Sequence, residues 1–394
     1  MREGWEYKKL GEVAAFYRGL TYTGKDEVDF SNNVVLRSNN VDLVRNTLNL
    51  NELKYISDEI TIPKDKMVKK DSILMCMSNG SKQHIGKVAY INKDYNCAFG
   101  GFMGLIIPNE NYIIPKLLYY YCCSCTFKQF VLSIVNGANI NNLRFSDLSN
   151  KTVPIPFFSI QSVILSELDM ITEMISKYDE QLKELDKLSQ SIFYEMFGDP
   201  VENEKGWEVK KLEEISREIG DGLHGTPVYT QYNTGYFFIN GNNLENGVIC
   251  IKENTKMVSE DTKCKYHIDM DTSTILVSIN GTLGKTAIYN GENVILGKSA
   301  CYIKLNSDVN KVYIHEIIKS DYFKKYANDE STGTTIKNVS LKSMRHFPII
   351  LPPLPLQQSF ARKIEAIEAM KSKVREAKKE AETLLAARMQ YWFE

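Results

Sequence analysis

The sequence predicts an α+β protein in which two similar globular domains are joined by two long antiparallel helices that form a coiled coil. Three observations predict this class. Sequence landmarks recur after about 200 residues, each copy mixes short β-rich runs with turns and lacks βαβ alternation, and each copy is followed by a long helical pattern. This period is too long for a solenoid, so we interpret it as a pseudo-two-fold internal repeat of one domain and one helix.

The repeat rests on four landmarks that occur in the same order in both halves. They are residues 4–13 (GWEYKKLGEV) and 206–215 (GWEVKKLEEI), residues 73–77 and 275–279, residues 85–89 and 283–287, and residues 137–143 and 333–339. The halves diverge between these landmarks, where loops are expected. One scaffold is therefore expected to present two different surfaces.

The landmarks divide the chain into four segments. We expect a first globular domain at residues 1–158, a first long helix at 159–200, a second globular domain at 201–354 and a second long helix at 355–394. Within the domains, short runs such as Val34–Leu36 alternate with Asn, Gly and Asp, as strands and turns do. A shorter helix is expected in each domain, at about residues 115–131 and 312–328.

Both long segments have the apolar spacing of a helix that packs along one stripe against another helix. The expected seam consists of Ile164, Leu168, Ile171, Ile175, Tyr178, Leu182 and Leu185 in the first helix, and of Ile367, Met370, Val374, Ala377, Ala381 and Leu384 in the second. Burial of each Leu or Ile contributes roughly 1.5–3 kcal/mol and an exposed ion pair only about 0–1 kcal/mol, so the seam dominates the pairing. The alternative is that each helix packs only on its own domain.

Composition and charge limit the possible functions. The 394 residues contain no apolar run of the ~18 needed to span a membrane, and they start without the pattern of a signal peptide, so we expect a cytoplasmic protein without membrane contact. The net charge of −1 argues against indiscriminate nucleic-acid binding. The eight cysteines contain one isolated C-x-x-C pair, Cys122 and Cys125, so we expect reduced, buried thiols and no metal site.

Motifs of catalysis are missing from the sequence. A DNA amino-methyltransferase needs a Gly-rich cofactor loop and an Asn/Asp-Pro-Pro-aromatic segment, and neither occurs. The nearest look-alike, Phe99-Gly100-Gly101-Phe102, is interpreted as a tight turn between strands. Glu52-Leu53-Lys54 is interpreted as a solvated charge pair, and Gly284-Lys285-Thr286 lacks the earlier glycine of a P-loop. The sequence thus predicts a non-catalytic protein without a cofactor of its own and disfavours a self-sufficient enzyme.

Over its whole length the chain resembles the specificity subunits of type I restriction–modification systems. The features that carry the resemblance are Trp5–Leu10 and Trp207–Leu212 at the start of each repeat, Gly86-Lys87 and Gly284-Lys285, residues 193–200 (FYEMFGDP), residues 221–227 (DGLHGTP) and residues 352–358 (PPLPLQQ). Their order and double occurrence carry more weight than any single one. The first copy departs from the pattern at residues 156–162 (PFFSIQS), which affects a domain–helix junction.

The resemblance implies a DNA-reading function that is divided between the repeats. Each globular half would be a target-recognition domain that reads one half of a bipartite site in double-stranded DNA, and the helices would set the spacer between the half-sites. Two adenine-methyltransferase subunits would dock on the helices, and a restriction subunit (endonuclease and translocase) would join the complex. S-adenosylmethionine, ATP and Mg are expected only on these partners. A protein-binding coiled-coil scaffold without direct DNA readout is the alternative.

The candidate DNA-binding residues are polar, and most of them recur at matching positions. They are Arg37, Asn39 and Asn40 with Asn240, Asn242 and Asn243; Ser78, Asn79, Ser81, Lys82, Gln83, His84 and Lys87 with Asn280, Thr282 and Lys285; Asn139, Asn141, Asn142 and Arg144 with Thr334, Thr335, Lys337 and Asn338; and His224, Thr226 and Tyr229 in the second half alone. Asn pairs with adenine and Arg with guanine, whereas Lys suits phosphate. The alternative that Asn and Gly only shape turns stays open for each residue.

Overall fold

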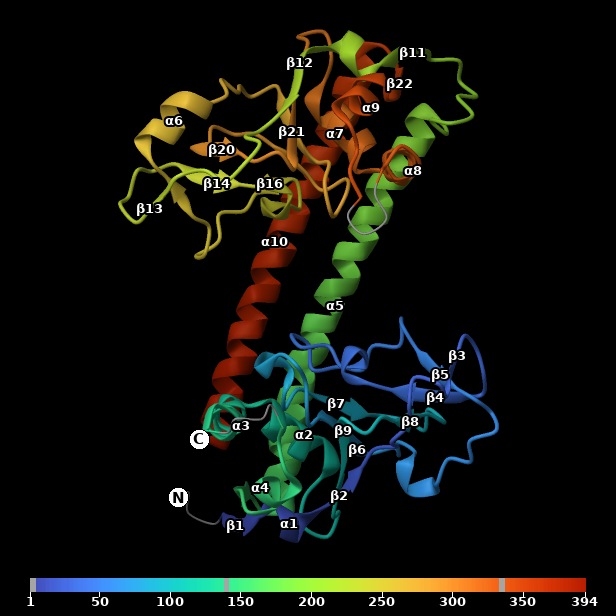
Figure 1. Cartoon of the computed structure of the whole chain (residues 1–394), viewed down its shortest axis with the longest axis vertical. Coiled ribbons are helices and arrows are strands. Elements are labelled where there is room, and N and C mark those ends of the chain that lie inside the picture. The colour runs from blue at the N-terminus through green and yellow to red at the C-terminus, as the bar shows by residue number, and fades with distance from the viewer. Residues whose placement is uncertain (1–4, 138–141, 333–336) are drawn as a thin grey trace. The chain divides into compact units, whose positions relative to one another are not determined.

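The computed structural model describes residues 5–137, 142–332 and 337–394 and divides into two compact units (Figure 1). Unit 1 comprises residues 1–179 and 376–394, and unit 2 comprises residues 180–375. Each unit contains one globular domain and a segment of each of two long helices, α5 (Phe158–Phe197) and α10 (Leu354–Phe393). The predicted α+β class with two long helices is confirmed.

The domain of unit 1 is built from two four-stranded sheets and a short strand pair. Its elements are β1 (Glu6–Lys9), α1 (Leu10–Val13), β2 (Ala14–Arg18), β3 (Glu27–Val28), β4 (Asn33–Leu36), η1 (Ser38–Asn40), β5 (Lys54–Ile56), η2 (Lys64–Lys66), β6 (Ser72–Cys76), η3 (Lys82–His84), β7 (Val88–Ile91), β8 (Ala98–Phe99), β9 (Met103–Pro108), α2 (Pro115–Cys123), α3 (Cys125–Gly137), α4 (Phe145–Ser149) and β10 (Thr152–Ile155). The strand orders are β2-β9-β6-β7, β3-β5-β4-β8 and β1-β10.

The domain of unit 2 repeats this arrangement. Its elements are β11 (Glu208–Lys211), η4 (Leu212–Ile215), β12 (Ser216–Asp221), β13 (Tyr229–Thr230), β14 (Phe237–Ile239), η5 (Gly241–Asn243), β15 (Leu244–Glu245), β16 (Val248–Ile249), β17 (Met257–Val258), α6 (Glu260–Tyr266), β18 (Thr274–Ser278), β19 (Thr286–Ile288), β20 (Val294–Leu296), β21 (Ala300–Leu305), α7 (Lys311–Lys319), α8 (Asp321–Asp329), α9 (Leu341–His346) and β22 (Pro348–Leu351). Its strand orders, β12-β21-β18-β19, β13-β17-β14-β20 and β11-β22, match those of unit 1, and β15-β16 forms an additional pair.

The central strands explain where the core lies. Successive residues of a strand point to opposite faces, and β6 is buried along its whole length. Ile73 and Met75 face a core formed with α2, α3 and the long helices, whereas Leu74 and Cys76 face the core between the two sheets. A strand buried on both faces reads as a continuous apolar run, which is why residues 73–77 stand out in the sequence.

The shorter helix expected in each domain is broken in two, which corrects the prediction of one helix at 115–131 and one at 312–328. Ser124 separates α2 from α3 and Ser320 separates α7 from α8, both in an extended conformation. The Ser124 hydroxyl accepts a hydrogen bond from the N–H of Phe127 and donates one to the carbonyl of Tyr121. A serine in this position ends one helix and caps the next.

The predicted repeat is confirmed by backbone hydrogen bonds that recur at matching positions. The paired bonds are Leu20 N–H to Phe99 O and Leu223 N–H to Leu296 O, Met77 N–H to Phe102 O and Ile279 N–H to Ser299 O, and Leu143 N–H to Met77 O and Val339 N–H to Ile279 O. These contacts define the alignment of the two domains residue by residue. Gly19 and Gly222 are one matched pair, and a Cβ at either position would lie 2.0 Å from the carbonyl oxygen of Gly100 or Leu296, respectively.

Each long helix is fastened to its domain by a buried glutamine. Gln161 accepts from the Ile114 N–H and donates to the carbonyls of Tyr112 and Pro156, each at 2.8 Å. Gln357 accepts from the Asn310 N–H at 2.9 Å and donates to the Pro352 carbonyl at 2.7 Å. The departure from the family pattern at residues 156–162 therefore leaves the junction itself intact.

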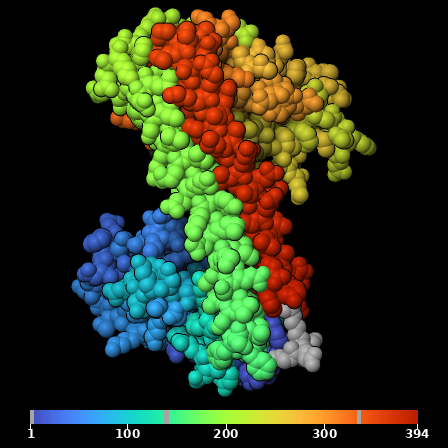
Figure 2. All heavy atoms as spheres, turned by 180° about the vertical axis from the view of Figure 1, so that it is seen from behind, coloured from blue at the N-terminus to red at the C-terminus, as the bar shows by residue number. Residues whose placement is uncertain are grey.

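The two long helices run antiparallel and side by side within each unit (Figure 2). In unit 1, Arg388 donates to both carboxylate oxygens of Glu167, and Lys378 bonds Asp179 at 2.7 Å. In unit 2, Lys371 bonds Asp186 at 2.7 Å. The alternative in which each helix packs only on its own domain is wrong.

The seam of α5 agrees with the prediction better than the seam of α10. Ile164, Leu168 and Ile171 are buried, and Ile175, Tyr178, Leu182 and Leu185 are half-buried. In α10, Ile367, Val374 and Ala381 are buried and Ala377 is half-buried, but Met370 and Leu384 are 55% and 49% exposed, which corrects their assignment to the seam. The seam positions are instead taken by Lys371, Lys378 and Leu385, because the lysine stems pack between the helices while their ammonium groups reach aspartates of α5.

The cysteines are free thiols, but they are not all buried as predicted. Cys76, Cys97, Cys122 and Cys301 are buried and Cys123 and Cys250 are half-buried, whereas Cys125 and Cys264 are exposed. Burial raises the pKa of the Cys76 thiol. Within the described part of the chain, we find no cluster of three His, Cys, Asp or Glu residues arranged to hold a metal ion. The same residues contain no helix that is long and apolar enough to cross a bilayer.

Candidate nucleic-acid interface

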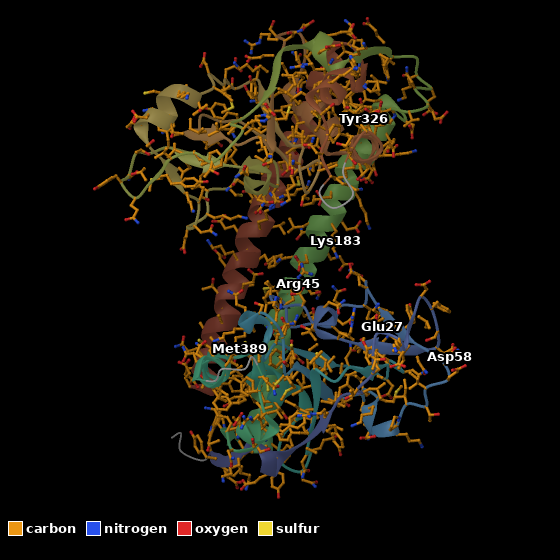
Figure 3. All side chains as sticks on the ribbon, viewed as in Figure 1. Glu27, Arg45, Asp58, Lys183, Tyr326 and Met389 are labelled. Carbon is orange, nitrogen blue, oxygen red and sulfur yellow. The ribbon has the colours of Figure 1, made fainter. Side chains whose placement is uncertain are left out.

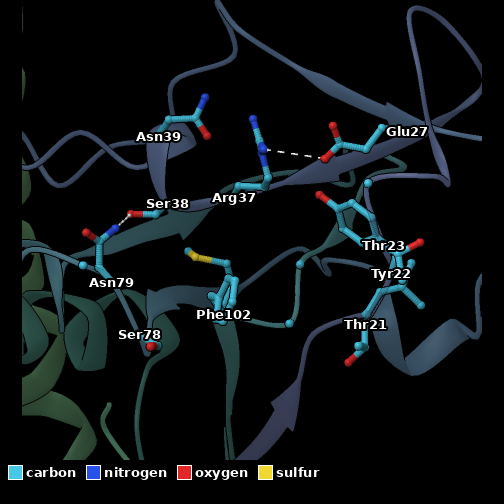
Figure 4. A pocket seen from close by; sticks show the side chains of 16 residues that line it. Thr21, Tyr22, Thr23, Glu27, Arg37, Ser38, Asn39, Ser78, Asn79 and Phe102 are labelled. Atoms are coloured by element: carbon cyan, nitrogen blue, oxygen red, sulfur yellow. Dashed lines mark hydrogen bonds and ion pairs between the residues drawn. The ribbon is translucent and has the colours of Figure 1, made fainter. Parts of the chain in front are cut away.

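The domain of unit 1 contains an open groove of about 1010 Å³ where several loops meet (Figure 4). It is lined by residues 20–24, Glu27, residues 37–39, residues 78–80 and residues 100–103. A smaller hollow of about 230 Å³ adjoins it and is lined by Ser78, Phe102, Asn142 and neighbouring residues. Both hollows share Ser78, residues 101–102 and Met103, so they form one continuous surface of polar and apolar residues.

The first predicted loop contributes to this groove through η1. Arg37 lies at its start with Nη1 4.0 Å from the Glu27 carboxylate, and Ser38 accepts a hydrogen bond from Asn79 at 2.9 Å. Asn39 is exposed on the groove. Asn40 is 1% exposed: its Oδ1 accepts from the Arg37 N–H at 2.8 Å, and its Nδ2 donates to two backbone carbonyls. Asn40 therefore shapes the turn and does not face the groove.

The matching loop of unit 2 uses its asparagines in the same way. Asn243 accepts from the Asn240 N–H at 3.1 Å and donates to the Cys250 carbonyl at 3.0 Å. Asn242 is exposed, like Asn39. Asn240 accepts from the Ser299 hydroxyl at 3.1 Å and is half-buried. In each pair of adjacent asparagines, one holds the backbone and the other faces outwards.

The second and third predicted loops lie next to each other in both domains. Ser78 forms a β-bridge with Asn142, and Asn280 forms one with Asn338. The Asn280 side chain also donates to Asn338 Oδ1 at 3.2 Å. Loops that are about 60 residues apart in the sequence thus form one surface in each domain.

Lys87 occupies a different place from the one expected of a phosphate ligand. It is 6% exposed, its Nζ donates to the Val41 carbonyl at 2.8 Å, and burial lowers its pKa. Its counterpart Lys285 is half-buried. Lys87 ties the first loop to β7, so we leave it out of the proposed DNA contacts, together with Asn40.

The remaining predicted residues lie at or near these loops. The exposed ones are Ser81, Lys82, Gln83, Arg144, His224, Thr226, Tyr229, Thr282 and Lys337, and the half-buried ones are Arg37, Ser78, Asn79, His84, Asn142, Asn240, Asn243, Asn280, Lys285 and Asn338. His224 bonds Asp221 at 2.8 Å, and Lys337 bonds Asn328 at 2.7 Å. Asn139, Asn141, Thr334 and Thr335 lie outside the described residues.

Sequence reasoning missed two parts of the groove in unit 1. Residues 21–24 line it and match the loop after Leu223 in unit 2, where His224 was selected. Alignment of the repeat at Leu20 and Leu223 would have found them. Phe102 is apolar and therefore falls outside a prediction based on polar side chains, although the tight turn predicted for residues 99–102 is confirmed.

Comparisons with known proteins agree with this architecture. The family model for the type I restriction modification DNA specificity domain matches twice, at residues 2–186 and 204–382. The chain is 21% identical to the EcoKI specificity subunit of Escherichia coli K12, over 93% of this chain and 82% of that subunit. It is 25% identical to the putative MjaX specificity subunit of Methanocaldococcus jannaschii, over 97% of this chain and 93% of the relative.

Solved structures show the same fold. The type I S subunit from M. genitalium aligns with a TM-score of 0.52 and 14% identity, covering 99% of this chain and 96% of that one. A chain of another type I restriction–modification system aligns with a TM-score of 0.53 and 16% identity, covering 99% and 97%. With two family domains and the fold of an S subunit, this chain belongs to the type I restriction–modification DNA specificity family, and it is a specificity subunit rather than a catalytic one.

Proposed function

We propose that each globular domain reads one half of a bipartite DNA target and that α5 and α10 set the distance between the half-sites. The observation that carries this proposal is the duplicated loop surface: the same backbone hydrogen bonds hold the loops in both domains, while the outward side chains differ. A scaffold repeated in this way presents two different sets of hydrogen-bonding groups to base edges. The functional segments are residues 1–158, 159–200, 201–354 and 355–394.

The proposed base contacts are the outward polar residues of these loops. In the first domain, Arg37, Asn39 and Asn79 line the groove together (Figure 4). Arginine pairs with guanine through two donors and asparagine pairs with adenine, each worth about 1–3 kcal/mol of discrimination. The exposed Lys82 and Arg144 suit phosphate. The domain therefore combines base readout with backbone contacts.

We also propose that methyltransferase subunits dock on the outer faces of the long helices. In unit 1, Val163, Met170 and Met174 are 58%, 64% and 42% exposed and share one face of α5. The position of α10 that matches Met174 in the repeat is Met370, which is 55% exposed in unit 2. Exposed apolar side chains at helical spacing suit a partner helix, and the exposed methionine at the repeat-related position of α10 suits a second copy of that partner.

The chemistry of the complex is assigned to its partners. S-adenosylmethionine is proposed to bind the methyltransferase subunits, and ATP and Mg the restriction subunit. The assembly is proposed to act in the cytoplasm, where its DNA substrate lies. Incubation of the purified chain with labelled S-adenosylmethionine and DNA should leave the DNA unlabelled, and labelling would contradict this assignment.

Sequencing of methylated adenines in cells tests the DNA-reading function. With this chain and its methyltransferase present, we expect one motif of two short words separated by a constant gap. Replacement of residues 201–354 by the equivalent domain of a relative should change one word and leave the other word and the gap unchanged. Replacement of residues 1–158 is the matched control and should change the opposite word. An uninterrupted motif, or methylation that ignores both exchanges, would contradict the proposal and favour a scaffold.

A further inference from the structure

Phe102 is an apolar side chain displayed at the centre of the groove in unit 1. It lies in the turn between β8 and β9, and its side chain is 73% exposed. The turn is fixed by hydrogen bonds from the N–H groups of Met77 and Ser78 to the Phe102 carbonyl, at 2.9 and 3.2 Å. An exposed aromatic ring on a fixed backbone contributes little to folding, and the position of this ring in the groove makes it available to a ligand.

Polar residues lie on both sides of Phe102. The ring lies between Ser78 and Asn79 on one side and Thr21 and Tyr22 on the other (Figure 4). It also lines the smaller hollow that contains Asn142. Met103 lines both hollows beside it, and Leu143 and Phe145 line the smaller one. An exposed apolar ring is thus placed next to hydrogen-bonding groups, a pattern that fits a surface on which apolar and polar groups also lie side by side.

The scaffold does not require an aromatic residue at this position. The matching residue of unit 2 is Ser299, whose carbonyl accepts the Ile279 N–H as the Phe102 carbonyl accepts the Met77 N–H. The Ser299 hydroxyl donates to Asn240 and accepts from the Gly241 N–H at 3.0 Å. The same turn therefore forms with an apolar outward group in one domain and an internally bonded hydroxyl in the other.

We propose that Phe102 contacts the C5-methyl group of a thymine in the half-site read by the first domain. The thymine methyl is the apolar group that a base edge presents in the major groove, and it lies beside donors and acceptors that polar side chains read. Phe102 with its polar neighbours has the complementary pattern. The inference rests on the proposed function and assigns a specificity-determining residue to one domain only.

Deoxyuridine provides the test, because it differs from thymidine by this methyl group alone. The complex of the chain with its methyltransferase subunits is titrated with duplexes in which each thymine of the first half-site is replaced in turn by uracil. We expect one replacement to weaken binding about fourfold, the effect of withdrawing one buried methyl group. With Phe102→Ala, the thymine and uracil duplexes should bind equally at that position.

Phe30→Ala is the matched control, since Phe30 belongs to the same domain, is 79% exposed and lies outside the groove lining. It should keep the fourfold discrimination. Equal binding of wild type to thymine and uracil at every position, or a first half-site without thymine, would overturn the inference. The inference would also be overturned if Phe102→Ala weakened binding of the thymine and uracil duplexes by the same factor and kept the fourfold discrimination, as expected for a wedge between bases. A complex that selects no bipartite sequence at all would instead refute the proposed function.

Discussion

Lys371 is a buried cation between the two long helices of unit 2, and its surroundings allow a sharp prediction. Its side chain is 1% exposed, and Nζ donates to Asp186 at 2.7 Å and to Glu368 at 2.8 Å. Burial alone lowers the pKa of Lys371, but the hydrogen bonds and charges of the two carboxylates outweigh burial and hold the pKa above its ordinary value. The two carboxylates therefore stabilise the charged form of Lys371 more than burial destabilises it.

The double variant Asp186→Asn/Glu368→Gln keeps the side-chain shapes and removes both negative charges. Loss of a partner from a buried ion pair costs about 3–5 kcal/mol. The side chains of Asp186 and Glu368 are 61% and 35% exposed, so water reaches this site in part. We therefore expect the free energy of unfolding to fall by about 2–3 kcal/mol. Lys371→Met removes the buried charge itself and leaves two hydrated carboxylates, so it should change stability by less than about 1 kcal/mol.

The pH dependence separates charge from packing. In the wild type the raised pKa of Lys371 contributes stability that is fully present below the ordinary value of 10.5 and is lost as pH rises through the folded pKa. Among the described residues, only the charge of Glu316 remains in the double variant to oppose burial, so we expect the pKa of Lys371 to fall below that of the unfolded chain. The loss in free energy of unfolding of the double variant should be fully present below this lowered pKa and should become smaller as pH rises towards 10.5. Lys371→Met has no titrating group at this position and should show neither trend.

Trp207 reports on this unit, because the other tryptophans, Trp5 and Trp392, belong to unit 1. Its indole N–H donates to the Phe197 carbonyl at 2.8 Å, and its ring packs on the core of unit 2. Urea titration of the full chain labelled with fluorotryptophan, followed by ¹⁹F NMR at pH 7 and pH 10, measures the stability of unit 2. Equal losses in Lys371→Met and in the double variant would refute the argument from charge.

Three further predictions follow from single contacts. Asn40→Ala should lower the free energy of unfolding by about 2–3 kcal/mol, because it removes buried hydrogen bonds. Asn39→Ala should leave the melting temperature unchanged and weaken target selectivity. Calorimetry measures the first effect and binding titration the second. Gln161→Leu leaves one buried N–H and two carbonyls unpaired and should cost about 2–4 kcal/mol, seen as faster hydrogen exchange at the start of α5. Gly222→Ala places a Cβ 2.0 Å from the Leu296 carbonyl oxygen. It should lower the free energy of unfolding, measured by urea denaturation, by on the order of 3 kcal/mol. An unchanged urea midpoint would contradict the close approach of the two backbone segments.

The architecture was predictable because its signals are repeated along the sequence. The landmarks at residues 4–13 and 206–215 mark matching strand pairs, and the apolar spacing after Ser159 marks a helix that continues to Phe197. Short-range signals of this kind need no knowledge of distant contacts. The break at Ser124 was missed because the apolar pattern continues through it, although a serine that caps the following turn ends α2 there.

The seam of α10 shows the limit of apolar pattern alone. The prediction chose Met370 and Leu384 because they are apolar, but the structure places Lys371 and Leu385 in the interface. A shift of one residue turns a side chain by about 100° around the helix. Lys371 is accommodated in this seam by Glu368 on its own helix and by Asp186 opposite, and Asp186 is 185 residues away in the sequence. No local rule contains the position of Asp186.

The candidate site was predictable to the level of loops but not of side chains. Asn39 and Asn40 are adjacent and chemically identical, yet one faces the groove and the other bonds backbone groups that only the folded loop brings together. Phe102 is apolar, and residue polarity alone does not identify it as a candidate DNA contact. The direction of each side chain depends on backbone conformation, which sequence spacing within a loop does not determine.

The duplication also separates positions that hold the scaffold from positions that are free to change the DNA sequence read. Asn40 and Asn243 make equivalent backbone hydrogen bonds, so replacement of either is expected to damage its loop. Phe102 and Ser299 occupy the same turn with different outward chemistry, and the turn forms in both cases. The Ser299 hydroxyl is bonded within its own domain, whereas variation of the Phe102 side chain changes the apolar pattern of the groove without loss of the backbone bonds that hold the turn. New specificity in this chain should therefore arise with little cost in stability at Phe102, and only with large cost at Asn40.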